Sequence, residues 1–326
     1  MAVSPITRRT LLAGTASTAA ALSLPFSEAA ASSPATSQAP SIYRYKLGDY
    51  ELTAIHDGVW NRKIDASFVR GAAWSDVQKA MADAYMPEPG TLPIPFTALL
   101  VNTGAKLLLI DTGSGGQMTA TAGSLVDNLA AAGVKPKDID TIAISHFHPD
   151  HINGIKTKDD ALVFSNAEIM VPADELRFFM DDGNLSRASD SVRGVFLNAR
   201  RVFKTIEKTV TPFTPGKEIV LGVTPLAAPG HTPGHVVFAL ASGNASMMVL
   251  SDTTNRPELF ARHPEWQPVF DMDGPLAVAN RKHLLDRVSA DRMLVQSYYF
   301  PFPACGHIAR DGAGYAYVPS QWNPTL

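Results

Sequence analysis

The sequence predicts an α+β protein, and three observations support this class. Strand-like runs open the chain after residue 40 and return after residue 218, and segments with helical spacing lie between and after them. Of the 326 residues, 45% are hydrophobic and 18% are charged, which is typical of a globular protein with a sizeable core. The formal net charge of −3 favours no polyanionic partner such as nucleic acid.

The first 31 residues are typical of a targeting segment. Arg8 and Arg9 precede a small-residue apolar run that ends before Pro25, and a small-x-small cleavage site lies at 29–31. The paired arginines resemble a bacterial twin-arginine signal. We therefore predict a signal peptide over 1–31, a linker over 32–40 and a folded domain over 41–326. The expected protein is periplasmic or secreted, with no stable membrane anchor after cleavage.

The first half of the domain alternates strands and helices. A hairpin is expected about Gly48-Asp49, ending near His56, and Pro87, Pro89 and Pro93 predict a loop. The other predicted elements are helices over 74–86 and 118–133 and strands over 96–102, 106–110 and 141–144. A strand, a helix and a strand in this order indicate a βαβ-like step.

The second half returns to strands. Its predicted elements are a β-rich run over 163–171, helices over 173–181 and around 196–202, a hairpin of 236–240 with 247–250, a helix over 276–288 that Pro275 opens, and a last strand over 293–295.

The most informative stretch follows the apolar run 141–144. It places His146, His148, Asp150 and His151 within six positions of a chain that has nine histidines. Imidazole and carboxylate are the standard protein ligands of zinc and similar divalent metals. Because alternate residues of an extended segment point the same way, His146 and His148 can bind one ion together. Surface histidines on a polar loop are the ordinary alternative.

Other polar residues also follow predicted strands. His231 and Asp252 do so in the second half, and Asp111 precedes a glycine turn in the first. Asp111 either orients a ligating histidine or caps its turn. His56 stands alone beside a turn, which favours a structural role. The single cysteine, Cys305, excludes both an intrachain disulfide and a cysteine-rich zinc site.

Taken together, these motifs resemble the metallo-β-lactamase superfamily over nearly the whole domain. The resemblance rests on His146-x-His148-x-Asp150-His151, on His231 within Pro-Gly-His-Thr-Pro-Gly-His, and on Asp252 after an apolar strand. The chain looks most like the branch that contains methyl parathion hydrolase and related lactonases. The matching stretches are 47–49, 100–104 with 109–113, and 302–308.

The resemblance implies an αββα sandwich of two mixed sheets with helices outside. It also implies a centre for two zinc ions, where His146, His148 and His231 hold the first ion, Asp150 and His151 hold the second, and Asp252 bridges them. The nucleophile would be a metal-bound hydroxide, with catalytic roles for Asp150, Asp252 and Tyr299. His235 would be structural, because the branch uses the first histidine of its pair.

The chain departs from the branch at Tyr299, which stands where a histidine would complete the second ion's ligands. The second site has therefore lost a ligand or uses a phenolate, whose ordinary pKa is about 10. We expect that site to be weak, or to hold manganese, iron or cobalt.

The aromatic and apolar residues near the motif loops predict a pocket for a small neutral molecule. The candidates are Met118, Phe179, Phe196, Phe300 and Phe302, each with a core role as its alternative. The expected activity is hydrolysis of an ester, a lactone or an organophosphate triester. A hydrolytic dehalogenase of haloaromatics and a metal-binding or ligand-binding protein without catalysis are the alternatives. The resemblance also implies a homodimer as a candidate assembly.

Overall fold

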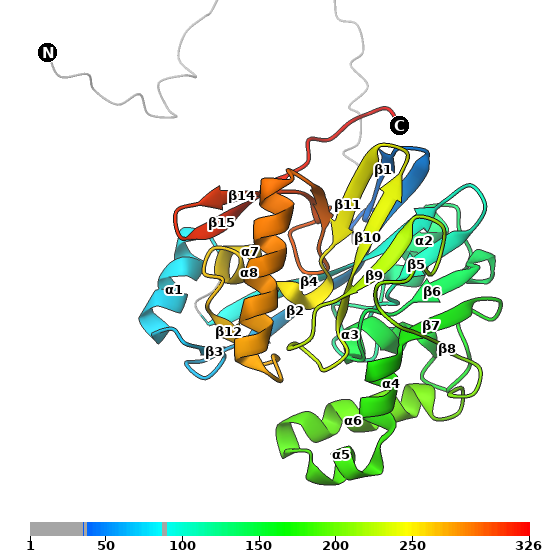
Figure 1. Cartoon of the computed structure of the whole chain (residues 1–326), viewed down its shortest axis with the longest axis horizontal. Helices are drawn as coiled ribbons and strands as arrows, with labels where there is room; N and C mark the ends of the chain where they lie inside the picture. The colour runs from blue at the N-terminus through cyan, green and yellow to red at the C-terminus, as the bar shows by residue number, and fades with distance from the viewer. Residues whose placement is uncertain (1–34, 36–37, 87–89) are drawn as a thin grey trace, which may run out of the picture. The chain divides into compact units, whose positions relative to one another are not determined.

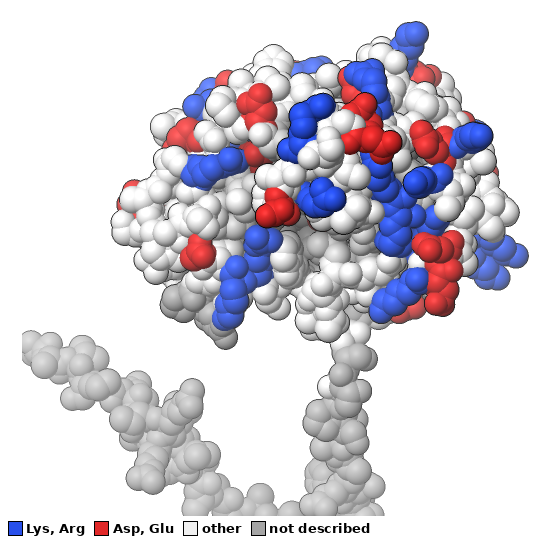
Figure 2. Space-filling model, turned by 90° about the horizontal axis from the view of Figure 1, so that it is seen from below, with Lys and Arg blue, Asp and Glu red and all other residues white. Residues whose placement is uncertain are grey.

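A computed structural model describes residue 35 and residues 38–86 and 90–326, and its compact folded unit spans Ala39–Leu326. The predicted signal peptide and most of the predicted linker lie outside the described residues. Among the residues that are described, no helix is both long and apolar enough to pass through a membrane. Basic and acidic side chains are interspersed over the face shown in Figure 2.

The first sheet has seven strands and is mixed. Its order follows the chain, and β5 to β8 pair in parallel while the other pairs are antiparallel. The strands are β1 (Ile42–Leu47), β2 (Tyr50–Lys63), β4 (Thr91–Asn102), β5 (Leu107–Ile110), β6 (Thr141–Ala143), β7 (Glu168–Pro172) and β8 (Thr211–Phe213).

The second sheet has six strands in the order β15-β14-β13-β11-β10-β9, and only β11 and β13 pair in parallel among its described strands. They are β9 (Val223–Ala227), β10 (Val236–Ser242), β11 (Ala245–Val249), β13 (Leu294–Gln296), β14 (Cys305–Asp311) and β15 (Gly314–Pro319). A small ribbon pairs β3 (Val69–Arg70) with β12 (Gln267–Pro268).

The two sheets bury a common core, because alternate residues of a strand point to opposite faces. On β4, Leu99 and Val101 face the space between the sheets, where they meet Phe238 of β10. Leu100 of the same strand faces the other way, into a second apolar cluster. Val237 of β10 likewise turns away from the first sheet into a third cluster.

Helices cover the outer faces of both sheets and complete an αββα sandwich, as expected (Figure 1). The outer face of the first sheet is covered by α2, α4 and α6, and that of the second sheet by α8. The helices are α1 (Trp74–Asp83), α2 (Leu125–Ala131), α3 (Pro149–Ile152), α4 (Ala173–Met180), α5 (Asp182–Arg187), α6 (Asp190–Phe203), α7 (Pro257–Phe260) and α8 (Gly274–Ala290).

Several predicted boundaries were wrong. Strand β2 continues past His56 through a bulge, and Pro93 lies inside β4 instead of in a loop. Pro93 fits there because β5 pairs only with 99–102, so β4 has a free side at that point. The helix predicted over 118–133 begins only at Leu125, since Gly123 has a φ of 121° that helices do not adopt. Two strands, β14 and β15, follow the strand expected to be last.

Candidate metal centre and adjoining cavity

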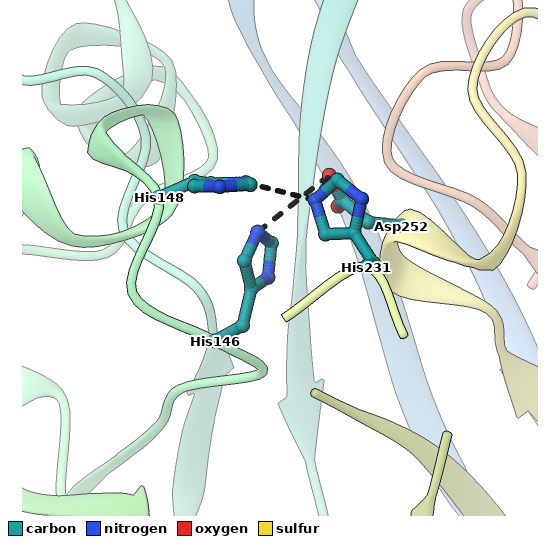
Figure 3. Close-up of side chains that lie close together, drawn as sticks. All are labelled: His146, His148, His231 and Asp252. Carbon is teal, nitrogen blue, oxygen red and sulfur yellow. Dashed lines mark hydrogen bonds and ion pairs between the residues drawn. The ribbon is translucent and has the colours of Figure 1, made fainter. Parts of the chain in front are cut away.

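The predicted metal ligands meet where loops of the two sheets face each other. His146 and His148 follow β6 of the first sheet, whereas His231 follows β9 and Asp252 follows β11 of the second. Figure 3 shows these four side chains pointing toward one another from both sides. One ligand atom from each lies within 4.8 Å of the others.

The contacts within this group are short. Nδ1 of His148 lies 2.8 Å from Nε2 of His231, which itself lies 3.0 Å from Oδ2 of Asp252. Nε2 of His146 is 3.6 Å from the same carboxylate oxygen. All four side chains are buried except that of His148, which is half-buried. The arrangement is therefore compact and mostly shielded from water.

The group has the properties of a cation site. Burial lowers the pKa of His146 well below its ordinary value and that of His148 to about 3, so both imidazoles are neutral and able to donate an electron pair. Nε2 of His146 is buried without a hydrogen-bond partner among the described residues. Buried polar atoms are rarely left unpaired, and three imidazoles with one carboxylate suit a divalent ion such as zinc.

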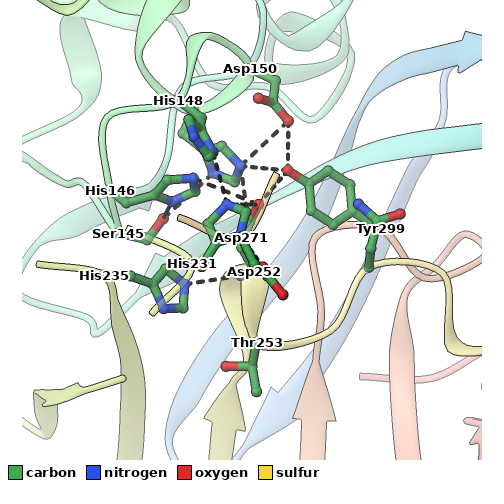
Figure 4. A network of polar contacts seen from close by, with 12 residues as sticks. Ser145, His146, His148, Asp150, His231, His235, Asp252, Thr253, Asp271 and Tyr299 are labelled. Atoms are coloured by element: carbon green, nitrogen blue, oxygen red, sulfur yellow. Dashed lines mark hydrogen bonds and ion pairs between the residues drawn. The ribbon is translucent and has the colours of Figure 1, made fainter. Parts of the chain in front are cut away.

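Tyr299 lies across the centre from His146, with Asp150 beside its hydroxyl (Figure 4). His151 contacts the same group. Nε2 of His151 lies 3.0 Å from Oδ1 of Asp252 and 3.4 Å from Oδ2 of Asp150. The Tyr299 hydroxyl lies 2.6 Å from Oδ2 of Asp252 and 2.8 Å from Oδ2 of Asp150, and its single proton bonds to one of them at a time. It is also 3.0 Å from Nε2 of His151.

The surroundings of Tyr299 favour the protonated phenol. Burial and the adjacent Asp150 and Asp252 carboxylates raise its pKa well above the ordinary value. A cation between the same groups would oppose this shift, since positive charge stabilises a phenolate. Tyr299 thus stands at the position that the family resemblance indicated, with its oxygen aimed into the centre.

Asp111 orients two histidines that follow the first sheet. This is one of the two roles that the sequence left open for it. Its Oδ2 accepts hydrogen bonds at 2.8 Å from Nδ1 of His151 and from Oγ of Ser145. Ser145 Oγ also lies 3.0 Å from Nδ1 of His146. A carboxylate behind an imidazole fixes the ring's orientation and its tautomer. One buried aspartate therefore positions two histidines.

A second support was not visible in the sequence. Nδ1 of His231 donates at 2.9 Å to Oδ1 of Asp271, whose Oδ2 accepts at 3.0 Å from the buried Arg281. Arg281 also donates to the carbonyl of Thr253, beside Asp252. Asp271 lies in a mixed apolar and acidic stretch without a motif, and Arg281 lies inside α8, so no local pattern marks either residue. Together they hold His231 and the Asp252 loop.

Glu175 of α4 joins the two histidine loops through their backbones. Its carboxylate accepts hydrogen bonds from the amides of Phe147, at 2.9 Å, and Gly234, at 2.7 Å. His235 has a structural position, because its Nδ1 donates to the carbonyl of Ala228 and its Nε2 accepts from the amide of Asp252. Nδ1 of His56 contacts the Thr97 hydroxyl, at 3.1 Å.

A cavity of about 330 Å³ opens from the centre. At its polar end lie His148, Asp150, His231, Asp252 and Tyr299. Most of the remaining wall is apolar, and includes Trp60, Ile94, Phe96, Val195, Phe270 and Met272. Of the predicted pocket residues, Met118 lines this cavity.

Four predicted pocket residues do not line it. Phe179 and Phe196 pack against each other with tilted rings, whose centres are 4.8 Å apart, in the core between α4 and α6. Phe300 is fully buried behind the second sheet, in the cluster that also contains side chains of α8. Phe302 packs on the His56 ring at 5.6 Å and is partly exposed outside the cavity. For Phe179, Phe196 and Phe300 the core role is the correct one, whereas Phe302 belongs to neither the core nor the cavity.

Comparisons with known proteins agree with this architecture. Solved structures that the chain resembles include the hydrolase AbOPH in the beta lactamase superfamily, with 26% identity, a TM-score of 0.82, and coverage of 88% of this chain and 100% of that one. Another is AidC, a dizinc quorum-quenching lactonase in complex with a product, with 27% identity, a TM-score of 0.81, and coverage of 87% and 98%.

A curated relative matches over a shorter stretch. Ribonuclease Z of Clostridium kluyveri is 39% identical over 69 residues, and the match spans a fifth of each chain. Residues 94–296 match the family model of the metallo-beta-lactamase superfamily. This match covers more than half of the chain, and it includes both histidine motifs and Asp252. The chain therefore belongs to the metallo-beta-lactamase superfamily.

Proposed function

We propose that the chain is a zinc-dependent hydrolase of small lactones and other carboxylic esters. The observation that carries this proposal is the four-donor group at one end of a mostly apolar cavity of about 330 Å³. Small-molecule sites have this character, with apolar walls and a few convergent polar groups. The likeness to a protein described as a dizinc lactonase supports both the metal and the substrate class.

The residues have distinct roles in this proposal. His146, His148, His231 and Asp252 would hold the first ion, and Asp150 and His151 with Asp252 would hold the second. When bound, the ions supply Lewis acidity that activates water and polarises the substrate carbonyl.

The chain's own groups position the substrate and the proton. The apolar wall holds the acyl part of the ester and excludes water from it. Asp150 faces the cavity beside the Tyr299 hydroxyl, so it can take a proton from the attacking water and return it to the departing alkoxide oxygen. Tyr299 keeps its own proton and bonds to Asp150 or Asp252, which holds the two carboxylates in place.

A substrate panel tests the proposal. Purified protein is loaded with zinc, manganese or cobalt and assayed on lactones, aryl esters, phosphotriesters and chlorinated aromatics, with Asp252→Ala as the control. We expect lactones and esters to be hydrolysed, and Asp252→Ala to lose more than the roughly 10–100-fold that removal of a supporting partner costs. The phosphotriesters test whether the chain also hydrolyses organophosphates, as its resemblance to the methyl parathion hydrolase branch implies.

Two outcomes would contradict the proposal. Turnover of chlorinated aromatics alone would favour a hydrolytic dehalogenase. If the protein exceeded the Asp252→Ala control on no substrate, a binding protein without catalysis would be the better description.

A further inference from the structure

One cation lies in the apolar wall of the cavity. Arg62 is carried by β2 beyond the bulge at His56 and lines the cavity. Its guanidinium carbon lies 4.6 Å from the ring centre of Trp60, 4.8 Å from that of Phe270 and 5.5 Å from that of Phe68. Aromatic faces attract such a cation and fix the plane of its fork.

The hydrogen-bonding capacity of Arg62 is not used by the protein. No hydrogen bond or ion pair joins its guanidinium to another residue in the described part of the chain, although the side chain is only half-exposed. The rings satisfy the charge in part. Burial lowers the pKa of Arg62, against the opposing effect of Asp65.

Arg62 and the metal centre belong to one cavity. The metal-ligand side chains form its polar end, and apolar residues such as Ile94 and Val195 form part of the same wall as Arg62. A molecule bound in the cavity therefore contacts the metal centre, the Arg62 guanidinium and an apolar surface. A guanidinium fork binds carboxylate or carbonyl oxygens, which are its usual partners.

We propose that Arg62 selects substrates that carry an sp² oxygen acceptor, either a carboxylate or an amide carbonyl, away from the ester bond that is cleaved. The inference rests on the proposed ester and lactone hydrolysis and narrows its substrate class. The sequence predicted a pocket for a small neutral molecule. The inference adds an oxygen acceptor to that description and also admits an anionic substrate with a carboxylate. The other role for Arg62 is to hold the surrounding rings together, and substitutions of Arg62 itself separate the two roles.

The first experiment compares esters matched in length. The substrates are an aryl alkanoate, the same ester with a terminal carboxylate, and an N-acyl amino lactone with an amide carbonyl. Arg62→Met keeps an apolar side chain and removes the guanidinium fork, whereas Arg62→Lys keeps the positive charge without the fork. The control is Arg177→Met, because the exposed Arg177 side chain of α4 lies outside this cavity. Melting temperatures confirm that each variant folds.

We expect the wild type to favour at least one acceptor-bearing substrate over the plain ester by roughly tenfold in kcat/KM. Arg62→Met should lose that preference and still hydrolyse the plain ester, whereas Arg177→Met should keep it. The two acceptor-bearing substrates distinguish an anionic from a neutral acceptor. An unchanged preference in Arg62→Met, or equal activity of the wild type on all three substrates, would overturn the inference.

A binding experiment separates this inference from the proposed activity. Calorimetry on the zinc-loaded protein compares dicarboxylates from succinate to suberate, and their mono-amides, with monocarboxylates of the same length. We expect a dicarboxylate or a mono-amide to bind roughly tenfold more tightly than its monocarboxylate, and Arg62→Met to abolish the difference. If no ester or lactone were hydrolysed, this result would still decide the role of Arg62, and equal binding of all three series would refute it.

Discussion

The two halves of the polar centre share Asp252 but differ in how their own atoms are paired. On one side, His146, His148 and His231 present neutral or carboxylate-supported imidazoles, and Nε2 of His146 has no hydrogen-bond partner among the described residues. On the other side, the Tyr299 hydroxyl lies within hydrogen-bond distance of Asp150, of Asp252 and of His151. The first half has an imidazole nitrogen without a partner, whereas the second half already holds a hydroxyl that contacts all three of its side chains. Oδ1 of the shared Asp252, which faces His151, also lacks a hydrogen-bond partner among the described residues.

This difference predicts unequal ion affinities. An ion in the second half must replace hydrogen bonds that Tyr299 already makes, and each such bond to a charged group is worth about 1.5–3 kcal/mol. An ion in the first half also separates the His148 and His231 nitrogens, which lie 2.8 Å apart, but it gives Nε2 of His146 the partner that it lacks. The expectation from the sequence, that the second site is the weaker one, thus has a physical cause in the tyrosine contacts.

The largest expected effect comes from the carboxylates behind the histidines. Asp271→Asn should weaken the first ion by roughly 10–100-fold, because it removes the negative charge behind His231 and leaves one acceptor oxygen for two donors, His231 and Arg281. Asp111→Asn should weaken both ions, since Asp111 positions His151 directly and His146 through Ser145. Asparagine tolerates the φ of 61° at position 111, so the backbone is preserved.

Zinc titration against a coloured chelator measures both affinities. Asp273→Asn is a matched control for Asp271→Asn, because Asp273 caps α8 and contacts no histidine. Equal affinities in Asp271→Asn and the wild type would mean that His231 needs no support.

A smaller effect is expected at Tyr299. After dialysis the wild type should retain about one ion per chain, and Tyr299→His should retain about two, because an imidazole is a better zinc ligand than a phenol. Tyr299→Phe should not gain the second ion, since it removes a competing hydroxyl without supplying a ligand. Metal analysis by mass spectrometry provides the counts. Two tightly held ions in the wild type, unchanged in Tyr299→Phe, would contradict the proposed weakness.

The last effect concerns pH, and it acts on the stability of the fold instead of on ion affinity. Burial raises the pKa of Glu175 from 4.5 to about 7, so folding favours its protonated form. Its contribution to stability is therefore complete below about pH 4.5 and is lost as the pH rises through about 7. Relative to Glu175→Gln, the unfolding free energy of the wild type should fall by roughly 3 kcal/mol over this range. Urea denaturation at several pH values measures it, and a constant difference would show that Glu175 does not titrate there.

The sequence predicted those features that depend on residues close together in the chain. The histidine cluster, His231 and Asp252 carry recognisable spacing. For Asp111 the local signal, a carboxylate at a strand end before a glycine turn, left two roles open, and its contacts with His151 and Ser145 decide for the orienting one.

The residues that were missed depend on contacts distant in the sequence. Asp271 and Arg281 act on His231 from 40 and 50 positions away, and Glu175 reaches two loops that lie 28 and 59 positions from it. Phe179, Phe196 and Phe300 were misplaced for the same reason. Residue type indicates burial, but only packing decides whether an aromatic ring faces the core or the cavity.

The ligand atoms of the proposed first metal site come from both sheets, and this affects the stability of the fold. His146 and His148 are carried by the first sheet, and His231 and Asp252 by the second, so a bound ion would tie the two layers of the sandwich together like a cross-link. The unfolded chain does not hold these donors close. Each tenfold excess of free ion over its dissociation constant would therefore add roughly 1.4 kcal/mol to the free energy of unfolding. The centre that performs the chemistry would thus also set the heat resistance of the fold.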